Sequence, residues 1–549
     1  MPSFFKRHKR KKIDKVHNNK KEQTKKEDSK ENSSQNAAGP LNRSLAANLE
    51  VIKQKTGSSP DVIIRRLMVG GGPPVEIAIG YVEGLVEEQS VNDFLIKSIL
   101  NNDDIEVKNG EEILNKIEKD IIALGSIERV NDWEKLFQSM LSGKTIILID
   151  GSSEAISANT RGGEKRSILE PSTQNTIRGS RESFTEAIGT NIALVRRIIN
   201  NPNLWIEPRK LGTITQTDVS VMYINGIVKD EIVEEVRKRL DNIKLDSILE
   251  SGYIEQMIQD QTMTTFPTIF HTERPDMVAG NLLEGRVAIF INGTPFVLLA
   301  PAVFIQFFQT PEDYYIRSDI ATATRFLRVI TFFISLMGPA IYVAATTFHQ
   351  EMIPTQFLLI IAAQRDVVPF PAFVEALIME VTFEILREAG IRMPKIIGPT
   401  ISIVGALVIG QASVQAGIVS PAMVIVVSIT AIASFATPSF PMAISIRLIR
   451  FLFMLCAATF GFYGIVLAFI TLLAHLCGLR SFGVPYMSPL TPFIPENAGD
   501  TIFRRPWWDL RERPRLIGSK NTVRKGNNQK PEPPAAREMS SRKGDGDEI

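Results

Sequence analysis

The sequence predicts a soluble α+β N-terminal half made of two subdomains, followed by an all-α multi-pass membrane domain. Two observations carry this prediction. Up to about residue 305, short β-branched stretches alternate with amphipathic helical patterns and with Asp-Gly or Asn-Gly pairs. Beyond it, Ile396–Ile446 and Phe451–Leu479 are runs of 51 and 29 residues without a charged side chain, whereas a bilayer-spanning helix needs only about 20 apolar residues. A purely soluble protein is therefore excluded, although the net charge of +2 is unremarkable.

Residues 1–40 carry 12 Lys or Arg against 5 Asp or Glu and few apolar side chains. Such a segment buries too little apolar surface to fold, so we expect a disordered basic tail. Electrostatic attraction to anionic membrane lipid is the functional alternative. The segment lacks the apolar core of a secretory signal, which favours a cytoplasmic N-terminal half.

The first soluble subdomain is expected at residues 41–170. Its predicted strands are Asp61–Met68, Val75–Val82 and Thr145–Ile149, and its predicted helices are Val91–Asn101, Glu111–Leu124 and Asp132–Leu141. The pair Asp150-Gly151 follows the third strand and precedes another extended stretch. Asp-Gly between two such stretches predicts a β-hairpin.

The second soluble subdomain is expected at residues 171–305. Its predicted helices are Ser183–Asn200 and Lys229–Asn242. Asn225-Gly226 and Asn292-Gly293 predict two further hairpins. The second of these lies in the middle of Val287–Phe308, a stretch whose hydropathy resembles a membrane span, and therefore favours a soluble hairpin there.

The membrane domain is expected at residues 306–480, and residues 481–549 are expected to form a basic cytoplasmic tail. The candidate spans are Phe326–Phe348, Ile396–Ala416, Ser420–Thr437 and Phe451–Cys477. Pro354–Ala363 is too short to cross, and residues 367–390 form an amphipathic, interfacial helix. Counting Val287–Phe308 would give five spans, so the sequence leaves four or five open.

The uncharged run holds the candidate pore. Ile396–Ser420 is rich in Gly and Ala, which permits close helix packing within one subunit. The alternative is a gated pore, because apolar and amide side chains fall on one stripe and apolar constrictions close by dewetting. The candidate pore-lining residues are Thr400, Val404, Val408, Gln411 and Gln415.

The amphipathic helix carries acidic residues every four positions, namely Glu380, Glu384 and Glu388. They form either a solvated helix face or, in a symmetric oligomer, an acidic vestibule that concentrates cations at a pore mouth. Arg447 and Arg450, just before the last candidate span, are expected to reach the membrane interface.

Catalytic and metal-binding motifs are absent from the sequence, so no enzyme activity, cofactor or metal is expected. Nucleic-acid binding is not expected either. The charged residues Arg178, Arg181, Glu182 and Glu186 are expected to open a helix. Together with Arg161 they are candidates for an ion-pair seam between subdomains or subunits.

Several long phrases resemble the A subunits of bacterial spore germinant receptors, the GerA spore germination protein family. The matching phrases are DGSSEA (Asp150–Ala155), TRGGEKR (Thr160–Arg166), IRGSRESFTE (Ile177–Glu186) with Asn191–Arg197 after it, TERP (Thr272–Pro275), Arg325–Pro354, Phe370–Arg387 and Pro394–Ser420. The resemblance covers roughly Leu41 to Arg515. Gly163 departs from the aromatic residue expected in many members.

The resemblance implies a non-enzymatic, multi-pass protein of the spore inner membrane that signals nutrients. It implies a transporter-like B subunit and a C-subunit lipoprotein as partners, besides membrane lipid. It also implies a homo-oligomer, expected to be a pentamer, that forms a gated channel for monovalent cations. The alternatives are a membrane-anchored signalling scaffold, or the sporulation-specific paralogue that amplifies the signal without a nutrient partner, which the phrase around Ser180 resembles. Pro506-Trp507-Trp508 favours the receptor subunit. The sequence does not identify the nutrient.

Overall fold

The computed structural model describes residues 39–69, 74–100, 110–118, 126–162, 170–393, 398–518, 521–524, 526 and 529–531. The chain divides into two compact units. The first takes in residues 1–167 together with Ile192–Ile206, and the second takes in Ile168–Asn191 and everything from Glu207 onward. The helices of the expected membrane domain and the expected C-terminal tail thus belong to the same unit as the second soluble sheet. The expected boundary near residue 170 differs from this division by the segment 192–206.

The first unit is built on a five-stranded sheet with the strand order β1-β2-β4-β5-β3. Its paired strands are antiparallel and are β1 (Val62–Val69), β2 (Val75–Val82), β3 (Ile127–Val130), β4 (Thr145–Ile149) and β5 (Ala155–Ala158). Its helices are α2 (Leu45–Thr56), α3 (Glu88–Ser90), the π-helix η1 (Val91–Ile96), α4 (Lys97–Leu100), α5 (Gly110–Lys116) and α6 (Trp133–Leu141). The predicted hairpin at Asp150-Gly151 is confirmed, because β4 and β5 pair.

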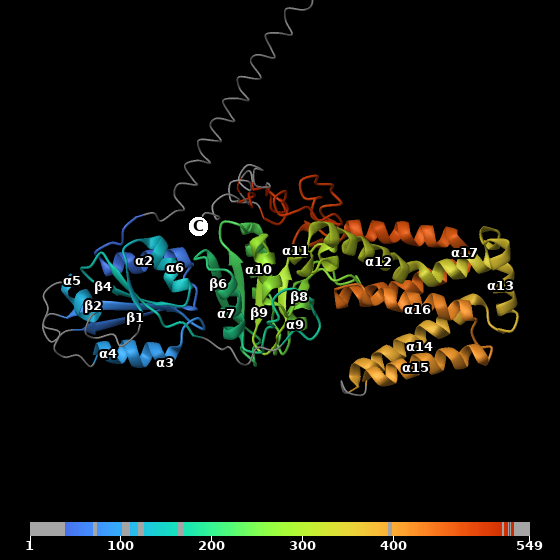
Figure 1. Ribbon diagram of the computed structural model, residues 1–549, viewed down its shortest axis with the longest axis horizontal. Coiled ribbons are helices and arrows are strands. Elements are labelled where there is room, and N and C mark those ends of the chain that lie inside the picture. The colour runs from blue at the N-terminus through green and yellow to red at the C-terminus, as the bar shows by residue number, and fades with distance from the viewer. Residues whose placement is uncertain are drawn as a thin grey trace, which may run out of the picture. The chain divides into compact units, whose positions relative to one another are not determined.

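Helices cover both faces of this sheet, with α2 and α6 on one face and α3 and α4 on the other (Figure 1). Because successive side chains of a strand point to opposite faces, Ala78 and Val82 join the core with α2 and α6, whereas Ile77 and Ile79 join the core with α4 and α5. Burial on both faces explains why β4 reads as one continuous apolar run.

The second sheet has the order β6-β7-β9-β10-β8. Its strands are β6 (Leu204–Leu211), β7 (Thr217–Ile224), β8 (Phe270–Thr272), β9 (Val287–Ile291) and β10 (Val297–Ala300), and the helices of this part of the chain are α7 (Ile188–Ile198), α8 (Asp230–Asp241), α9 (Ser251–Ile258) and α10 (Pro275–Leu283). The hairpin at Asn292-Gly293 is confirmed, and Val287–Phe308 holds strands rather than a membrane helix. The hairpin predicted at Asn225-Gly226 is wrong, because β7 pairs with β9 and the chain after Gly226 enters α8.

The two sheets are copies of one plan. Their strand orders correspond, and β1, β2, β4 and β5 recur as β6, β7, β9 and β10 with unchanged lengths and a constant shift of 142 positions, for example from 62 to 204 and from 145 to 287. The helix before β4 and the helix before β9 obey the same shift. The soluble half is therefore an internal duplication.

The duplication extends to single hydrogen bonds. In the first copy, Asp150 Oδ1 accepts from the backbone N–H of Leu45, at the start of α2, over 2.9 Å. In the second, Asn292 Oδ1 accepts from the backbone N–H of Ile188, at the start of α7, over 3.3 Å. Gly151, which has a positive φ of 86°, is the turn glycine that follows Asp150. The Asp-Gly and Asn-Gly turns therefore also cap a helix N-terminus in each copy.

The rest of the second unit is helical. Its helices are η3 (Phe304–Phe308, 3₁₀), α11 (Glu312–Tyr315), α12 (Ser318–Thr347), η4 (Gln350–Met352, 3₁₀), α13 (Thr355–Arg365), α14 (Ala372–Arg392), α15 (Gly398–Gln415), α16 (Pro421–Phe435) and α17 (Phe440–Gly478). Among the described residues, α12 and α17 are long and apolar enough to cross a membrane, and α16 is apolar but shorter.

Helix α17 is two antiparallel helices. Gly461 has φ 59° and ψ −141°, which no helix allows. Ser445 donates to the carbonyl of Thr265, and the neighbouring Thr264 hydroxyl lies 3.0 Å from His475 Nε2. Residues 445 and 475 of a straight helix would lie about 45 Å apart at 1.5 Å per residue, so the chain reverses at Gly461. The predicted single span Phe451–Cys477 is wrong for this reason.

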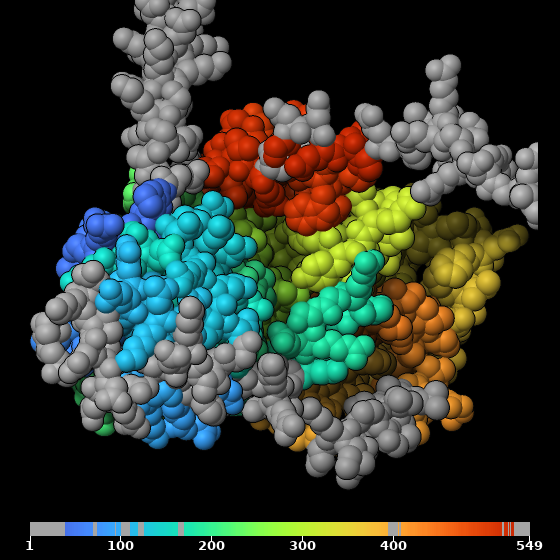
Figure 2. All heavy atoms as spheres, turned by 60° about the vertical axis from the view of Figure 1, so that its left-hand side comes forward, coloured from blue at the N-terminus to red at the C-terminus, as the bar shows by residue number. Residues whose placement is uncertain are grey.

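The C-terminal segment packs on the second unit rather than extending from it. The short strands β11 (Arg480–Ser481) and β12 (Val484–Pro485) form a two-stranded sheet. Further on, Gly518 forms an isolated β-bridge with Val228. Figure 2 shows the described C-terminal residues, in red, lying against the region coloured yellow-green, which includes α11 and the start of α12.

Candidate functional site

The candidate pore helix is α15, and part of it lies within the described side chains. Val408 is 56% exposed, and Gln411 and Gln415 are exposed. Thr400 and Val404 lie on the same helix, but their side chains fall outside the described part of the structure. The helix packs beside α14, where a Cβ at Gly405 would lie 3.0 Å from Leu386. One face of α15 is therefore packed against α14, while apolar and amide side chains elsewhere on the helix are exposed.

The acidic residues of α14 are paired with arginine, which corrects the expectation of a free acidic stripe. Glu380 lies 2.5 Å from Arg450, and both side chains are 3% exposed. Glu384 lies 2.6 Å from Arg447, and Glu388 lies 2.6 Å from Arg392. Of these three pairs, the one at Glu388 is largely exposed on both sides. The sequence spacing placed the three carboxylates on one helix but did not show that arginines of α17 face Glu380 and Glu384.

Arg450 joins three helices. Its Nε donates to the carbonyl of Ser335 on α12 over 2.6 Å, and its Nη2 donates to the Ser335 hydroxyl over 2.9 Å. Removing one partner of a buried ion pair leaves an uncompensated charge, which costs several kcal/mol. Arg450 is therefore a buried structural group, and the expectation that it reaches the membrane interface is wrong.

Glu375 ties the beginning of α14 to the beginning of α16. Its Oε1 accepts from the backbone N–H of Ser420 over 2.5 Å and from the Ser420 hydroxyl, and Arg365 lies 4.0 Å from Oε2. Ser420 caps α16 through its hydroxyl, which accepts from Met423 N. At the opposite ends of the same helices, Arg387 donates to the Ser434 hydroxyl over 2.7 Å. Helices α14 and α16 therefore run in the same direction.

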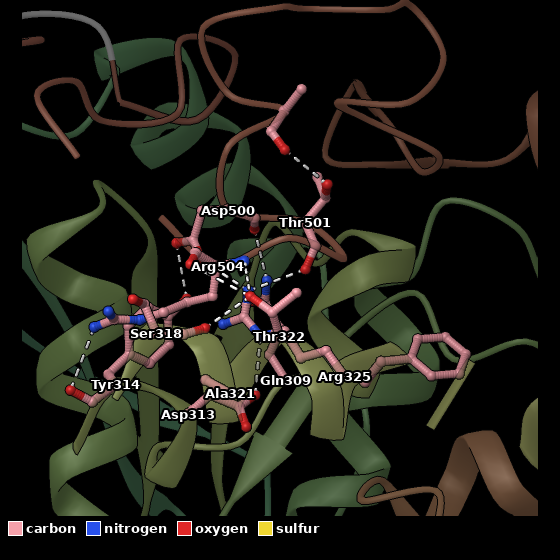
Figure 3. A network of polar contacts seen from close by, with 12 residues as sticks. Gln309, Asp313, Tyr314, Ser318, Ala321, Thr322, Arg325, Asp500, Thr501 and Arg504 are labelled. Carbon is pink, nitrogen blue, oxygen red and sulfur yellow. Dashed lines mark hydrogen bonds and ion pairs between the residues drawn. The ribbon is translucent and has the colours of Figure 1, made fainter. Parts of the chain in front are cut away.

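A buried polar network lies where α12 begins (Figure 3). Arg325, whose side chain is 2% exposed, pairs with Asp313 at 3.1 Å and with Asp500 at 2.9 Å. Arg328 lies 2.8 Å from the same Asp313 oxygen. The Tyr314 hydroxyl donates to Asp500 over 2.9 Å. The network thus joins α11, the first turns of α12 and the C-terminal segment.

Burial governs the titration of this network. Desolvation raises the pKa of Asp500 above its ordinary value, and Arg325 opposes that rise. Desolvation likewise raises the pKa of Tyr314, and the neighbouring Asp500 charge adds to the effect. A phenol that donates to a carboxylate keeps its proton at neutral pH. Tyr314 therefore serves this network as a hydrogen-bond donor to Asp500.

The residues expected at an ion-pair seam are dispersed. Arg178, Arg181, Glu182 and Glu186 precede α7 and do not open it. Arg181 pairs with Glu170 at 3.4 Å, and both side chains are more than two-thirds exposed. Arg161, in the first unit, forms a β-bridge with Val86. The described residues show no network that joins these side chains.

Sequence reasoning missed two buried charges that the matching phrases contain. In the first unit, Arg196 Nε lies 2.8 Å from Asp61, with side chains 0% and 7% exposed. In the second, the Glu273 carboxylate accepts from Thr173 N over 2.6 Å, from Thr173 Oγ1 over 2.7 Å and from Ser172 Oγ over 3.2 Å. Charged residues in otherwise apolar or turn-forming phrases were the available signal. Among the described residues, no cluster of three His, Cys, Asp or Glu could hold a metal ion.

A duplicated soluble α+β part joined to long apolar helices defines a membrane-associated protein with a large soluble region. A sequence profile described as Bacillus/Clostridium GerA spore germination protein matches residues 50–516. The chain therefore belongs to the GerA family of spore germination proteins, as the resemblance of its motifs predicted.

Relatives of this family match along most of the chain. Spore germination protein KA of Bacillus subtilis (strain 168) is 57% identical over 499 residues, which cover 91% of this chain and 91% of that protein. Spore germination protein GerLA of Bacillus cereus is 38% identical and covers 88% of this chain and 97% of that protein. The solved N-terminal domain of the A subunit of the Bacillus megaterium spore germinant receptor GerK3 is 45% identical, covers 50% of this chain and all of that chain, and has a TM-score of 0.40.

Proposed function

We propose that this protein is the A subunit of a nutrient-sensing germinant receptor and forms an oligomeric gated channel that releases monovalent cations. The observation that carries the proposal is the uncovered face of α15. Val408, Gln411 and Gln415 are exposed on a helix that has no charged residue. In a bilayer, amide side chains are costly unless they meet protein or water. A central channel between copies of the chain supplies both.

The directions of the helices support a chain that crosses the membrane six times. Helix α12 leaves the soluble part, and the two halves of α17 run away from Thr265 and back to Thr264, turning at Gly461 beside His349, which follows α12. Helices α14 and α16 run in the same direction. Helix α15, which follows α14 and precedes α16 in the sequence, therefore runs in the opposite direction. At 1.5 Å per residue the 15 residues of α16 span about 22 Å and the 30 residues of α12 about 45 Å. An even number of passes places the soluble half and the C-terminal segment on one side, proposed to be the cytoplasm.

The proposed setting follows the family. We place the protein in the spore inner membrane with a transporter-like B subunit and a C-subunit lipoprotein as partners, and with a pentamer as the channel. The acidic vestibule is reduced to Glu388 in this proposal, because Glu380 and Glu384 pair with arginines of α17, whereas the pair of Glu388 with Arg392 is largely exposed. No enzymatic activity is proposed.

The decisive experiment removes bulk from the proposed constriction. Val408→Ala should widen it and cause several-fold faster potassium efflux without nutrient, measured in proteoliposomes or dormant spores. Val466→Ala is the matched control, because Val466 is 55% exposed on α17 and makes the same change away from α15. Efflux equal to wild type in Val408→Ala, or equal stimulation by both variants, contradicts a pore at α15.

The oligomeric state gives a second, independent test. Light scattering of the full chain in detergent should report the mass of an oligomer, because a single copy leaves the α15 face open. A strict monomer in detergent and in lipid would remove the pore and favour a membrane-anchored scaffold. In that case the soluble half tethered by an unrelated helix should restore the response.

A further inference from the structure

A cavity of about 380 Å³ lies beneath the C-terminal segment in the second unit. Three parts of the chain line it. Helix α10 and the residues after it contribute Gly280 and Arg286, the segment through α11 contributes Gln306 and Tyr314, and the C-terminal segment contributes Trp507 and Arg524. A cavity of this size accommodates a small organic molecule.

Two buried polar side chains that line the cavity are incompletely paired. Arg286 is 5% exposed, and its Nη1 donates to Asn281 Oδ1, but its Nε has no hydrogen-bond partner among the described residues. Gln306 is 3% exposed, and its Nε2 donates to the same Asn281 oxygen over 3.0 Å, while its Oε1 has no partner in the described part of the chain. An unpaired buried donor or acceptor costs about 1–3 kcal/mol. An anionic ligand that accepts from the Arg286 guanidinium reduces the cost at that group.

The charge of the lining favours an anion. Three guanidinium groups line the cavity, those of Arg286, Arg513 and Arg524. Two carboxylates also line it, but Asp276 already pairs with Arg274 at 2.7 Å and accepts from the Tyr315 hydroxyl over 2.8 Å. Of the two carboxylates that line the cavity, Glu284 is therefore the one that faces the three arginines, lying 3.1 Å from Arg524 and 3.7 Å from Arg286. Burial lowers the pKa of Arg286, and a second anion beside it would offset this effect.

The walls of the cavity favour a ligand whose anionic group is attached to a planar or apolar part. The indole of Trp507 donates through Nε1 to the carbonyl of Tyr314 over 3.2 Å, and the two rings lie 5.8 Å apart. Arg524 lies 5.9 Å from the Trp507 ring. Aromatic walls with a few fixed polar groups are typical of sites for small organic ligands.

We propose that this cavity binds a small organic carboxylate, with its carboxylate on Arg286 and its planar or apolar body against Trp507 and Tyr314. The ligand contacts the duplicated soluble part, α11 and the C-terminal segment at once. It also lies beside Tyr314 and Asp500, which connect to Arg325 at the start of α12. Binding therefore strengthens the attachment of the C-terminal segment to the membrane helix, whether or not α15 lines a pore.

The test uses the full-length protein in detergent with benzoate as the probe. Equilibrium dialysis of labelled benzoate should show saturable binding that unlabelled benzoate displaces and the neutral isostere benzamide does not. Inorganic phosphate should compete at least tenfold more weakly than benzoate, because it lacks the planar body. Phosphate competing as well as benzoate, or the absence of saturable binding to the folded protein, overturns the proposal.

Two variants locate the binding. Arg286→Gln should weaken the binding of benzoate at least tenfold. Gly280→Leu should block it without removing any contact, because a Cβ at Gly280 meets no atom within 4 Å and the side chain enters the cavity. Gly189→Leu is the matched control, since Gly189 is also a helical glycine with open space around its Cβ. Wild-type affinity in a folded Gly280→Leu variant, or equal loss in Gly189→Leu, contradicts the site.

Discussion

The two copies of the soluble repeat are built on the same sheet plan but differ in what pairs with the segment after their second strand. In the first copy, Val86 forms its β-bridge with Arg161, which follows that copy's last strand directly. The counterpart of Val86 in the second copy is Val228, and its bridge partner is Gly518, more than two hundred residues beyond β10. The first copy is therefore completed by its own chain, whereas the second is completed by a segment that returns from the far side of the helical part.

The same contrast appears at the turn before β4 and β9. Lys144, in the first copy, pairs with the exposed Glu128 at 2.6 Å. Its counterpart Arg286 is buried among Asn281, Glu284 and the C-terminal segment. The same position of the repeat thus forms a surface ion pair in one copy, whereas in the other it is buried and lines the cavity beneath the C-terminal segment. The second copy therefore differs from the first in packing against the C-terminal segment.

The largest expected effect comes from breaking that attachment. Arg325→Ala leaves Asp313 and Asp500 without their shared buried partner, so we expect a loss of about 3–5 kcal/mol in the second unit. Thermal unfolding in detergent, followed by limited proteolysis of each unit, measures it. Arg317→Ala is the control, because Arg317 pairs with Asp319 on the surface and its side chain is 81% exposed. That variant should lose at most about 1 kcal/mol, and equal losses would contradict a specific role of the network.

A smaller, pH-dependent effect is expected at Glu273. Burial alone would raise the pKa of its carboxyl, but hydrogen bonds from Thr173 and Ser172 outweigh burial and hold the pKa below its ordinary value. The stability it provides is therefore present above the unfolded pKa of about 4.3 and is lost as the pH falls through the folded pKa.

Glu273→Gln should cost about 1.5–3 kcal/mol at neutral pH, because hydrogen bonds to a charged group are lost. It should also flatten the decline in stability below about pH 4.3. Denaturant titrations of the full chain at several pH values measure both effects. Glu170→Gln, at an exposed ion pair, should leave the stability within about 0.5 kcal/mol. An unchanged acid limb in Glu273→Gln would show that the carboxylate does not provide this stability.

The sequence predicted local structure well wherever one residue type decides it. Val75–Val82 and Thr145–Ile149 were placed without error, and Asp132 caps α6 by accepting from Lys135 N over 2.7 Å. The Asn225-Gly226 hairpin failed because the turn glycine ends a strand in either case, and only tertiary pairing decides whether a strand or a helix comes next. The duplication went unrecognised, although Gly84 and Gly226 and the two capping turns repeat with one spacing.

The candidate site was less predictable, because its contacts join distant parts of the chain. Spacing placed Glu380 and Glu384 on one face of a helix, but their pairing with Arg450 and Arg447 depends on how α14 packs on α17. The reversal at Gly461 depends on one glycine with positive φ inside a continuous apolar run. Hydropathy averages over such a residue, so one long span was predicted where two antiparallel helices exist.

The smallest expected effect tests the glycines at the two β-bridges. They are Gly518 in the second copy and Gly162, next to Arg161, in the first. A Cβ at Gly518 would lie 2.6 Å from the carbonyl oxygen of Glu284, and a Cβ at Gly162 would lie 2.6 Å from the backbone nitrogen of Glu87. Each Gly→Ala change should therefore cost about 1–3 kcal/mol through overpacking. Gly526→Ala is the control, because its nearest contact is an ordinary 3.7 Å.

The two variants should differ in where the chain opens. Gly518→Ala should release the C-terminal segment, so that trypsin cleaves between Arg504 and Arg524 at protease concentrations that spare the wild type. Gly162→Ala should leave that segment protected, since the β-bridge of the first copy does not involve the C-terminal segment. If the C-terminal segment becomes equally sensitive in both variants, the two copies are coupled through more than the contacts at Gly518. If it stays protected in Gly518→Ala, the Arg325 network holds it without the β-bridge.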